Sequence, residues 1–552
     1  MLDSKKKLKM KKVFLLLSAC AGTLFVSCDE SLIEPFAPGA LTETVAIQTS
    51  NDLQGLMNST YANLYNREDA VFTSVFTDEA GIGFANGGQG ITEEYVFFLN
   101  SSSAAPNAVW NSMYFALSRA NRVITFADRI TPVDADDAAK IQRLKAEALV
   151  VRAFCHLKLM AYFSTDLKND GALAAILSDR IIPSTETNLQ RSTNGVFYQA
   201  IHSDLDAAIT IYSNVGANPD ITGIAKTYYA SEVLAKALKA RAYSYKGDYT
   251  NAETWADNVI STSGITLANT TQYTQIFWTD NEPANVEVIW RLKRTPAQNG
   301  QGSNMHNGWC SVRPNAAGSP FYEVGRSLFN IMNPTNIASG THTNPVTTNG
   351  GWPLTAAIKD VRFRTLVAPS SVVASDWNTN VDYINADKLI IHKYGGVATG
   401  TSTFASTAAN GNNNDYKLVR LSEMYFIKAE ARANANDLTG AAAALETVLD
   451  ARNAVDVPAP VFANATQAWA EILNQRRLEF CFEGYRFIDL KRLASLANFT
   501  ALDRHPQDYS SSTTNYPGAN PANLPMNSYK FAFPIPTSET NANTAITQNP
   551  GY

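Results

Sequence analysis

The chain has 552 residues, of which 45% are hydrophobic and 17% charged, and its formal net charge is −5. A nucleic-acid-binding protein needs a basic face, and no run of Lys or Arg follows Lys12, so charge argues against that class. Length alone suggests about three or four domains. The charged fraction is low against a typical value of about 25%, and Asn, Ser and Thr take its place. Uncharged polar residues with 10% aromatic residues suit a surface that meets neutral, hydroxyl-rich ligands, and they suit equally the polar coat of an exported protein.

The first residues have the composition of an export signal. A basic stretch, Lys5–Lys12, precedes an apolar run, Val13–Val26, that is too short to span a bilayer. Ser27 and Cys28 close this run, and an acidic pair follows at once. Such a cysteine is typical of bacterial lipoprotein processing, in which the thiol is acylated and becomes the first residue. The sequence therefore predicts a signal peptide over residues 1–27 and a lipid anchor at Cys28.

Cys20 is an alternative lipidation site. The residues before it, Leu17-Ser18-Ala19, match the consensus of such sites better than the residues before Cys28 do. Cleavage at Cys20 would leave an apolar run of only seven residues, so we favour Cys28. Removal of residues 1–27, which carry six Lys and one Asp, changes the net charge to about −10.

The remaining cysteines do not indicate a metal site. Cys155 and Cys481 lie among apolar helical residues, and we predict that they are small buried hydrophobic residues. No pair of cysteines has a metal-type spacing such as C-x-x-C. We predict neither a metal site nor a cofactor.

Helical periodicity begins after a linker, residues 28–45, that contains prolines and a glycine. Apolar residues then recur at helical spacing over residues 46–66. Two longer helices are predicted over Ala108–Ile130 and Ala146–Tyr162 from the same spacing.

An internal repeat links Leu238–Ile260 with Ile427–Leu449. At a constant spacing, identical residues coincide at Ala240/Ala429, Ala242/Ala431, Asp248/Asp437, Ala252/Ala441 and Val259/Val448. Small residues beside a tight turn let two antiparallel helices approach closely, which is typical of tetratricopeptide (TPR) helical pairs. We prefer TPR-like pairs to unrelated helical hairpins, with degenerate pairs also around residues 108–165 and 196–212. The predicted fold class is mainly α, a TPR-like helical-pair scaffold with a long loop-rich insertion that carries a few short strands.

The insertion, residues 262–416, differs from its surroundings. Gly, Asn, Thr, Ser and Pro dominate it, and only residues 286–292 and 388–394 have the pattern of short strands. Five of the eight tryptophans lie there. Loops on a rigid scaffold carry binding surfaces, and an aromatic ring flanked by Asn, Gly and Asp suits a sugar.

These flanks select candidate ligand-binding residues. In the insertion they are Trp309, Arg313, Trp352 and Trp377, and an acidic pair in an early loop adds Asp78 and Glu79. A lone Trp is more often an anchor of the local core, and that alternative stays open for each tryptophan.

Charged residues gather again in Gln475–Arg492, QRRLEFCFEGYRFIDLKR. The cluster comprises Arg476, Glu479, Glu483, Gly484, Arg486 and Asp489. Spacings of three and four place its first three members on one helix face, Gly484 is expected to end or bend that helix, and a second helix is predicted over Arg486–Leu493. Carboxylates beside arginines have lowered pKa values and are poor proton donors. We therefore prefer a structural ion-pair network to a general acid and base.

This cluster resembles the C-terminal signature of the SusD/RagB family, the surface nutrient-binding lipoproteins of certain Gram-negative bacteria. Gln475 and Phe480 are mild departures from that signature. The helical segments with Trp110, Asn121 and Arg152 are similar to the same family, and so is the chain's ending, QNPGY.

The resemblance implies one SusD-like domain over residues 46–552. Within it, residues 46–261 and 417–499 form the helical scaffold, 262–416 the ligand region and 500–552 a C-terminal tail.

The resemblance also implies a function. The protein would bind a glycan, such as starch, or a similar nutrient at the cell surface, without catalysis, and deliver it to a SusC-like TonB-dependent outer-membrane barrel. After residue 27 no apolar run approaches the roughly 20 residues of a membrane helix, so the pore belongs to a partner.

Two alternatives remain. A lipid-anchored polysaccharide hydrolase on the same scaffold needs only two carboxylates across a cleft, which leave no sequence motif. The chain lacks a nucleophile elbow, a P-loop and an H-E-x-x-H motif. A TPR adaptor that binds only protein is the third interpretation.

Overall fold

The protein is described here by a computed structural model. The described residues are 43–64, 67–83, 86, 93–294, 305–309, 321–332, 359–368, 389–395, 414–508 and 522–552. The chain divides into two compact units, Met1–Gln48 and Thr49–Tyr552. The first contributes one short helix, α2 (Glu43–Ala46), to the described residues. The anchor residue Cys28 and the candidates Arg313, Trp352 and Trp377 lie outside the described residues.

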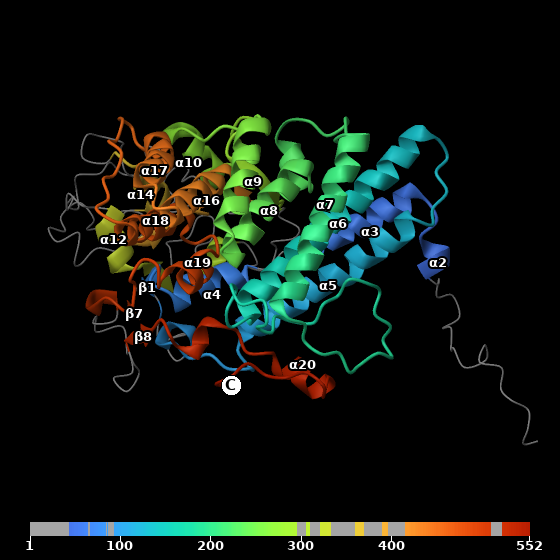
Figure 1. The fold of residues 1–552 in the computed structure, drawn as a ribbon, viewed down its shortest axis with the longest axis horizontal. Helices are drawn as coiled ribbons and strands as arrows, with labels where there is room; N and C mark the ends of the chain where they lie inside the picture. Colours follow the sequence, from blue (N-terminus) through green and yellow to red (C-terminus); the bar gives the residue numbers. More distant parts are fainter. Residues whose placement is uncertain are drawn as a thin grey trace, which may run out of the picture. The chain divides into compact units, whose positions relative to one another are not determined.

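Helices build most of the second unit (Figure 1). The longer ones are α3 (Ser50–Leu64), α4 (Glu68–Phe76), α5 (Ala104–Ala127), α6 (Ala135–Phe163), α7 (Asn194–Val215), α8 (Glu232–Lys246), α9 (Tyr249–Thr262), α10 (Thr270–Trp278), α16 (Leu421–Asn434), α17 (Leu438–Arg452), α18 (Ala465–Phe480) and α19 (Arg486–Leu493). The shorter ones are α12 (Arg326–Met332), α14 (Val361–Leu366), α20 (Thr537–Ala542), and the 3-10 turns η2 (Glu94–Val96), η3 (Gly223–Tyr228), η4 (His306–Gly308), η6 (Pro506–Asp508) and η7 (Tyr529–Phe531). The predicted mainly α fold class is confirmed.

The two long predicted helices begin earlier than the apolar pattern indicated. Helix α5 begins at Ala104 because Pro106 lies in its first turn, where a missing backbone N–H costs no hydrogen bond. Helix α6 begins at Ala135, after the side chain of Asp134 accepts a hydrogen bond of 2.8 Å from the Asp137 N–H. Because the first turns of both helices are polar, the apolar pattern did not show where these helices begin.

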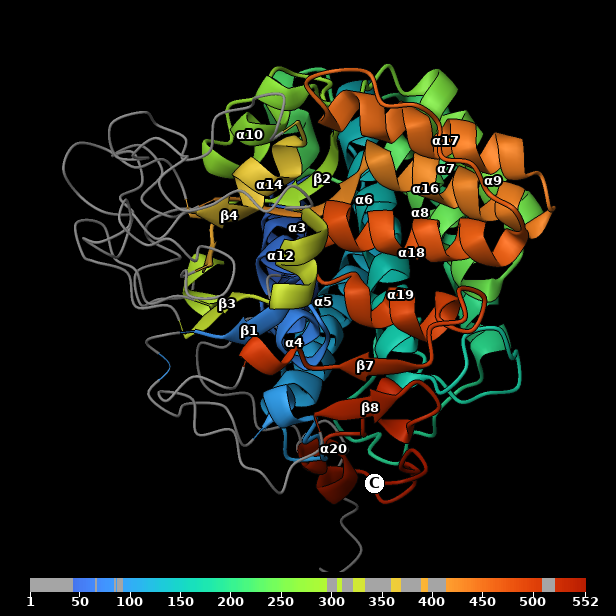
Figure 2. The same cartoon turned by 90° about the vertical axis from the view of Figure 1, so that its left-hand side faces the viewer.

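The predicted repeat corresponds to two helical pairs, α8/α9 and α16/α17. Gly247 and Asn436 occupy matching turn positions, and both have left-handed backbones, with φ of 82° and 59°. The next residues, Asp248 and Asp437, cap the second helices by accepting hydrogen bonds from backbone N–H groups. Helix α16 packs against both α8 and α9, so the pairs stack although their sequences lie far apart (Figures 1 and 2).

Short strands join distant segments to this scaffold. One antiparallel sheet has the order β1-β3-β5-β4, from β1 (Ala80–Ile82), β3 (Tyr322–Val324), β5 (Ile390–Ile391) and β4 (Val367–Ala368). Strand β2 (Val288–Leu292) pairs with β6 (Tyr416–Arg420), and β7 (Ala501–Asp503) pairs with β8 (Asn523–Pro525). Strands β2 and β5 lie within the two segments for which strands were predicted. The described parts of residues 262–416 are thus tied to residues before and after them.

The C-terminal tail returns to the C-terminal end of α6. The Phe533 N–H donates to the Tyr162 carbonyl at 2.8 Å, and the Asn549 amide donates to the Phe163 carbonyl at 2.7 Å. The Phe533 ring packs within 5.7 Å of the Phe487 ring of α19, measured between ring centroids. The tail therefore closes the core beside the charged cluster.

Candidate functional site

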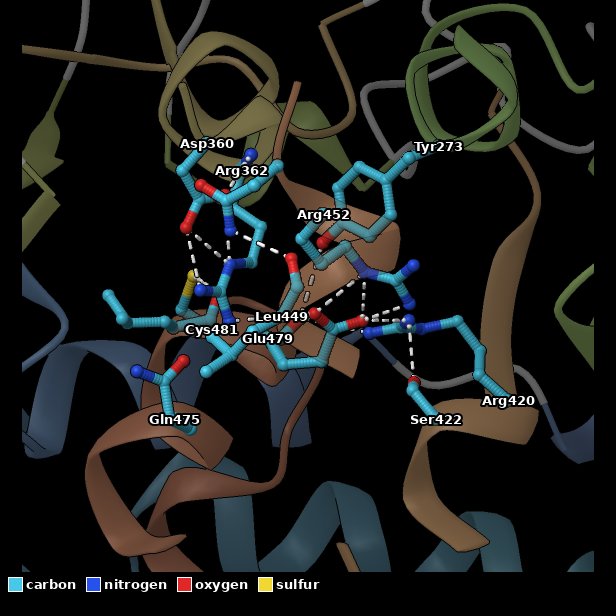
Figure 3. Close-up of polar contacts among 12 residues, drawn as sticks. Tyr273, Asp360, Arg362, Arg420, Ser422, Leu449, Arg452, Gln475, Glu479 and Cys481 are labelled. Carbon is cyan, nitrogen blue, oxygen red and sulfur yellow. Dashed lines mark hydrogen bonds and ion pairs between the residues drawn. The ribbon is translucent and has the colours of Figure 1, made fainter. Parts of the chain in front are cut away.

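Glu479 lies at the centre of the charged cluster that the sequence singled out. It occupies the last turn of α18 and is fully buried. Its Oε1 atom accepts hydrogen bonds from Arg420 Nη1 at 2.6 Å and from Arg452 Nη2 at 2.9 Å. Figure 3 shows the two guanidinium groups converging on this carboxylate. Arg420 ends β6 and Arg452 ends α17, so one side chain joins three elements.

Glu287 is the second carboxylate between the same two arginines. Its Oε1 lies 3.0 Å from Arg420 Nη1 and its Oε2 lies 3.0 Å from Arg452 Nη2. Glu287 also accepts a hydrogen bond from the Ala268 N–H at 3.0 Å. The two arginines are therefore matched by two buried carboxylates, as a buried charge network requires.

The electrostatics of this site oppose acid–base chemistry. Burial alone would raise the pKa of Glu479, but Arg452 and Arg420 outweigh it and hold that pKa well below its usual range. The pKa of Glu287 is lowered by the same two arginines against the effect of burial. Both carboxylates stay ionised and neither is accessible to a substrate. The network is built to hold segments together.

Glu483 reaches the same network from a turn and not from the helix. Helix α18 ends at Phe480, so the prediction that Glu483 shares a helix face with Glu479 is wrong. Phe482 and Gly484 take left-handed backbones, with φ of 61° and 87°, and the chain reverses there. This turn lets Glu483 accept hydrogen bonds from Arg420 Nη2 at 2.8 Å and from Lys393 Nζ at 2.5 Å.

Gly484→Val is expected to lower the free energy of unfolding by at least about 1–2 kcal/mol, because a side chain is disfavoured at a left-handed backbone. A Cβ atom there would also lie 3.2 Å from the Tyr416 hydroxyl. Thermal unfolding of the full chain measures the change. Gly55→Ala, in helix α3 with nothing within 4 Å of the added carbon, is the control and should be neutral or stabilising. Loss of ligand binding at an unchanged melting temperature would argue against the structural role of Gly484.

The second half of the cluster is equally buried. Asp489 accepts from Arg476 at 2.8 Å, and Glu430 of α16 lies 3.3 Å from Arg476 and 2.7 Å from Arg492. Arg486 forms a bidentate pair with Asp78, at 2.7 and 2.8 Å. The charged members of the predicted cluster therefore join α18, α19 and the turn between them to one another and to other elements.

Asp78 and Glu79, two of the candidate ligand-binding residues, lie beside this network and contact it. Burial would raise the pKa of Asp78, but Arg477 and Arg486 hold it well below its usual range. Burial raises the pKa of Glu79 to about 8, and its Oε2 accepts from the Phe482 N–H at 3.0 Å. The two side chains are 8% and 0% exposed. Their geometry supports a structural role and offers no surface to a ligand.

Trp309 is an anchor of the local core. It is fully buried, its indole N–H donates to Ser74 Oγ at 2.7 Å, and its ring packs on those of Tyr394 and Phe482. The preceding Gly308 lets the backbone pass close to the Val71 side chain, since a Cβ atom at this position would collide with Val71. Of the two interpretations open for Trp309, the geometry supports the structural one.

No group of three or more His, Cys, Asp or Glu side chains among the described residues is arranged to hold a metal ion. No helix in the described ranges is both long and apolar enough to cross a membrane.

Comparison with protein families decides the membership of the chain. The family model of the SusD family matches residues 235–552, which is more than half of the chain. The chain belongs to the SusD family. A second family model, described as "Starch-binding associating with outer membrane", matches residues 43–243. The SusD family resemblance is thus confirmed, and with it membership of a starch- and carbohydrate-binding family associated with the outer membrane. No curated protein sequence matches the chain significantly.

Solved structures share the fold of this SusD family member. A SusD superfamily protein from Bacteroides thetaiotaomicron is 22% identical, with a TM-score of 0.68 over 91% of this chain and 100% of its own. A putative sugar binding protein from Bacteroides vulgatus is 20% identical, with a TM-score of 0.68 over 92% of this chain and 99% of its own. A laminarin-binding SusD-like protein is 19% identical, with a TM-score of 0.57 over 92% of this chain and 100% of its own.

Proposed function

We propose that the protein binds a glycan or oligosaccharide at the cell surface without catalysis, and delivers it to a TonB-dependent outer-membrane transporter. The observation that carries this proposal is the match of two carbohydrate-related family models, which together extend over residues 43–552. The carboxylates of Glu479, Glu483 and Asp78 support a non-enzymatic role, because each is paired with an arginine and its side chain is at most 8% exposed.

The ligand region is assigned to residues 262–416. Its described parts are fixed to the helical scaffold through fully buried groups. Lys393 donates to the carbonyls of Glu479 and Cys481, both at 3.0 Å, and Glu287 accepts from Arg420 Nη1 at 3.0 Å. The described parts of the region therefore form a rigid base, and rigidity lowers the entropic cost of binding. Arg313, Trp352 and Trp377 remain the proposed ligand-binding residues.

A glycan array probed with the full chain in detergent tests the binding function. We expect retention of a neutral polysaccharide, and a marked loss of that retention in Trp352→Ala or Trp377→Ala. Trp255→Ala is the matched control, because this ring lies on α9, where Lys239 covers it at 4.3 Å. Retention of no glycan by the folded full chain would contradict the proposal.

The partner is a SusC-like TonB-dependent barrel, with which the protein shares its membrane through the lipid at Cys28. Tethering to one membrane raises the effective concentration of the two proteins. Gentle detergent extraction and crosslinking should recover the protein with a large outer-membrane barrel. Recovery of the free monomer alone, with glycan uptake unchanged by deletion of the protein, would exclude delivery.

Cys28→Ala is expected to move the protein from the membrane fraction to the soluble fraction, because the thiol that carries the lipid is removed. Fractionation followed by immunoblotting measures the distribution. Cys20→Ala is the control and should leave the protein in the membrane fraction. The reverse pattern would assign the lipid to Cys20.

A further inference from the structure

A cavity of about 300 Å³ lies among α6, the end of α7, η3, the start of α8 and residues 263–289. Helices α6, α7 and α8 pack as neighbours, with α6 and α7 labelled side by side in Figure 1. Its volume is at the lower end of the roughly 300–1,000 Å³ of small-molecule sites. The charged cluster around Glu479 does not contribute to its walls.

Glu147 of α6 supplies an uncommitted hydrogen-bond acceptor to this cavity. The residue is only 7% exposed, and its Oε2 accepts from the Tyr61 hydroxyl at 2.6 Å. Tyr61 itself accepts from the Ala230 N–H at 2.8 Å, so its single proton is committed to Glu147. Among the described residues no donor lies within hydrogen-bond distance of Glu147 Oε1. Burial raises the pKa of Glu147 to about 7, as expected of a carboxylate with too few donors.

The remaining walls supply donors and an apolar surface. Arg143, one helical turn before Glu147, makes one long contact, 3.4 Å from Nη1 to the Val215 carbonyl, and leaves its other N–H groups available. The half-buried Tyr229 ring meets Tyr61 edge-on, with 6.1 Å between ring centroids. An acceptor, a donor fork and an aromatic ring therefore face one small volume.

Charge selects the class of ligand. The walls contain both signs of charge, with two cations, Arg143 and Lys226, and two carboxylates, Glu147 and Glu232. Glu232 is also paired with Lys236 at 2.8 Å. A cationic ligand would meet the two cations and an anionic ligand would meet Glu147. A neutral molecule with several hydroxyl groups donates to Glu147 and accepts from Arg143 without an unmatched charge.

We propose that this cavity is a second binding site, for a neutral mono- or disaccharide, in which Glu147 Oε1 accepts hydroxyl protons and Arg143 donates to hydroxyl oxygens. The volume excludes a long chain, so the site takes a free small sugar or the end of an oligosaccharide.

Calorimetric titration of the full chain with glucose, galactose, mannose, maltose and cellobiose tests this site. We expect at least one of these sugars to bind, and glucosamine and glucuronic acid to bind more weakly than their neutral counterpart. At about pH 9, where Glu147 is ionised, Glu147→Gln should weaken binding by about tenfold or more, because hydrogen bonds to a charged acceptor are the stronger ones. It keeps an oxygen for the Tyr61 hydroxyl, so its melting temperature should change little.

Two further variants make the outcome unambiguous. Ala217→Trp places a ring at the exposed rim of the cavity and should abolish binding without touching Glu147. Glu186→Gln, at an exposed ion pair with Arg180, should leave binding unchanged. Binding of no sugar at millimolar concentrations, or unchanged binding in both Glu147→Gln and Ala217→Trp, would overturn the proposal.

Polysaccharide retention on the array reports the main function independently. If the main function holds and this site does not, polysaccharide is retained and no small sugar binds. If this site holds, Glu147→Gln loses the small sugar and still retains polysaccharide. Loss of array retention with intact small-sugar binding would instead sink the main function alone.

Discussion

Glu479→Ala is expected to lower the free energy of unfolding by about 3–5 kcal/mol, the usual loss when one partner of a buried ion pair is removed. The substitution leaves the fully buried Arg420 and Arg452 with Glu287 as the carboxylate they still share. It also removes one of the two carboxylates near Arg362, whose Nη1 lies 3.8 Å from Glu479 Oε2 and whose Nη2 stays paired with Asp360. Urea unfolding of the full chain, followed by circular dichroism, measures the change.

Glu186→Ala is the matched control for this measurement. The Glu186 side chain is 38% exposed and pairs with Arg180, itself 54% exposed, so its loss should change stability by less than about 0.5 kcal/mol. A loss below about 1 kcal/mol for Glu479→Ala would mean that the network is not what holds these segments together.

Trp309→Ala is expected to destabilise the protein by about 3–5 kcal/mol, as large-to-small substitutions of buried aromatic residues do. The ring is fully buried, and its removal also leaves Ser74 Oγ without the indole donor. Thermal unfolding measures the loss. At a temperature where the variant is folded, its glycan retention should equal that of the unsubstituted protein.

Trp309→Phe is the milder companion, since it keeps a ring against Tyr394 and Phe482 and loses only the hydrogen bond and part of the volume. The free energy of unfolding of Trp309→Phe should lie between that of Trp309→Ala and that of the unsubstituted protein. If Trp309→Ala instead melts at the usual temperature and loses glycan retention, Trp309 is a ligand residue and the core assignment is wrong.

Much of the fold could be predicted from local sequence patterns. The turn residues Gly247-Asp248 predicted a helical pair because a left-handed residue followed by a capping carboxylate ends one helix and begins another, and Asn436-Asp437 repeats that chemistry. The second helix predicted at Arg486 also begins there, since Gly484 provides the reversal.

The partners within the network could not be predicted in the same way. Glu479 is paired with Arg420 and Arg452, and Arg420 is also paired with Glu287. These four residues come from segments far apart in the sequence, and no local periodicity relates them. Charged residues within short strands and at helix ends, such as Lys417 and Arg420 around Leu418-Val419, were the available signal. A charge placed where burial is expected implies a buried counter-charge without saying which one.

The ligand candidates show a different limit. Asn-Gly beside Trp309 suited a sugar site, yet Gly308 is required for the close approach of Val71. Composition around an aromatic residue therefore does not distinguish a tight packing turn from a binding loop. The acidic pair Asp78-Glu79 was ambiguous for the same reason, because its arginine partners lie some four hundred positions along the chain.

We propose that this SusD family member binds glycan without cleaving it. Incubation of the full chain with the glycan retained on the array, with bound glycan and new reducing ends measured in the same samples, tests it most directly. If the protein binds without cleaving, the concentration of free glycan falls in a saturable way. The concentration of reducing ends then stays at the level of the protein-free control. Reducing ends that accumulate in proportion to protein and time would show turnover and contradict it.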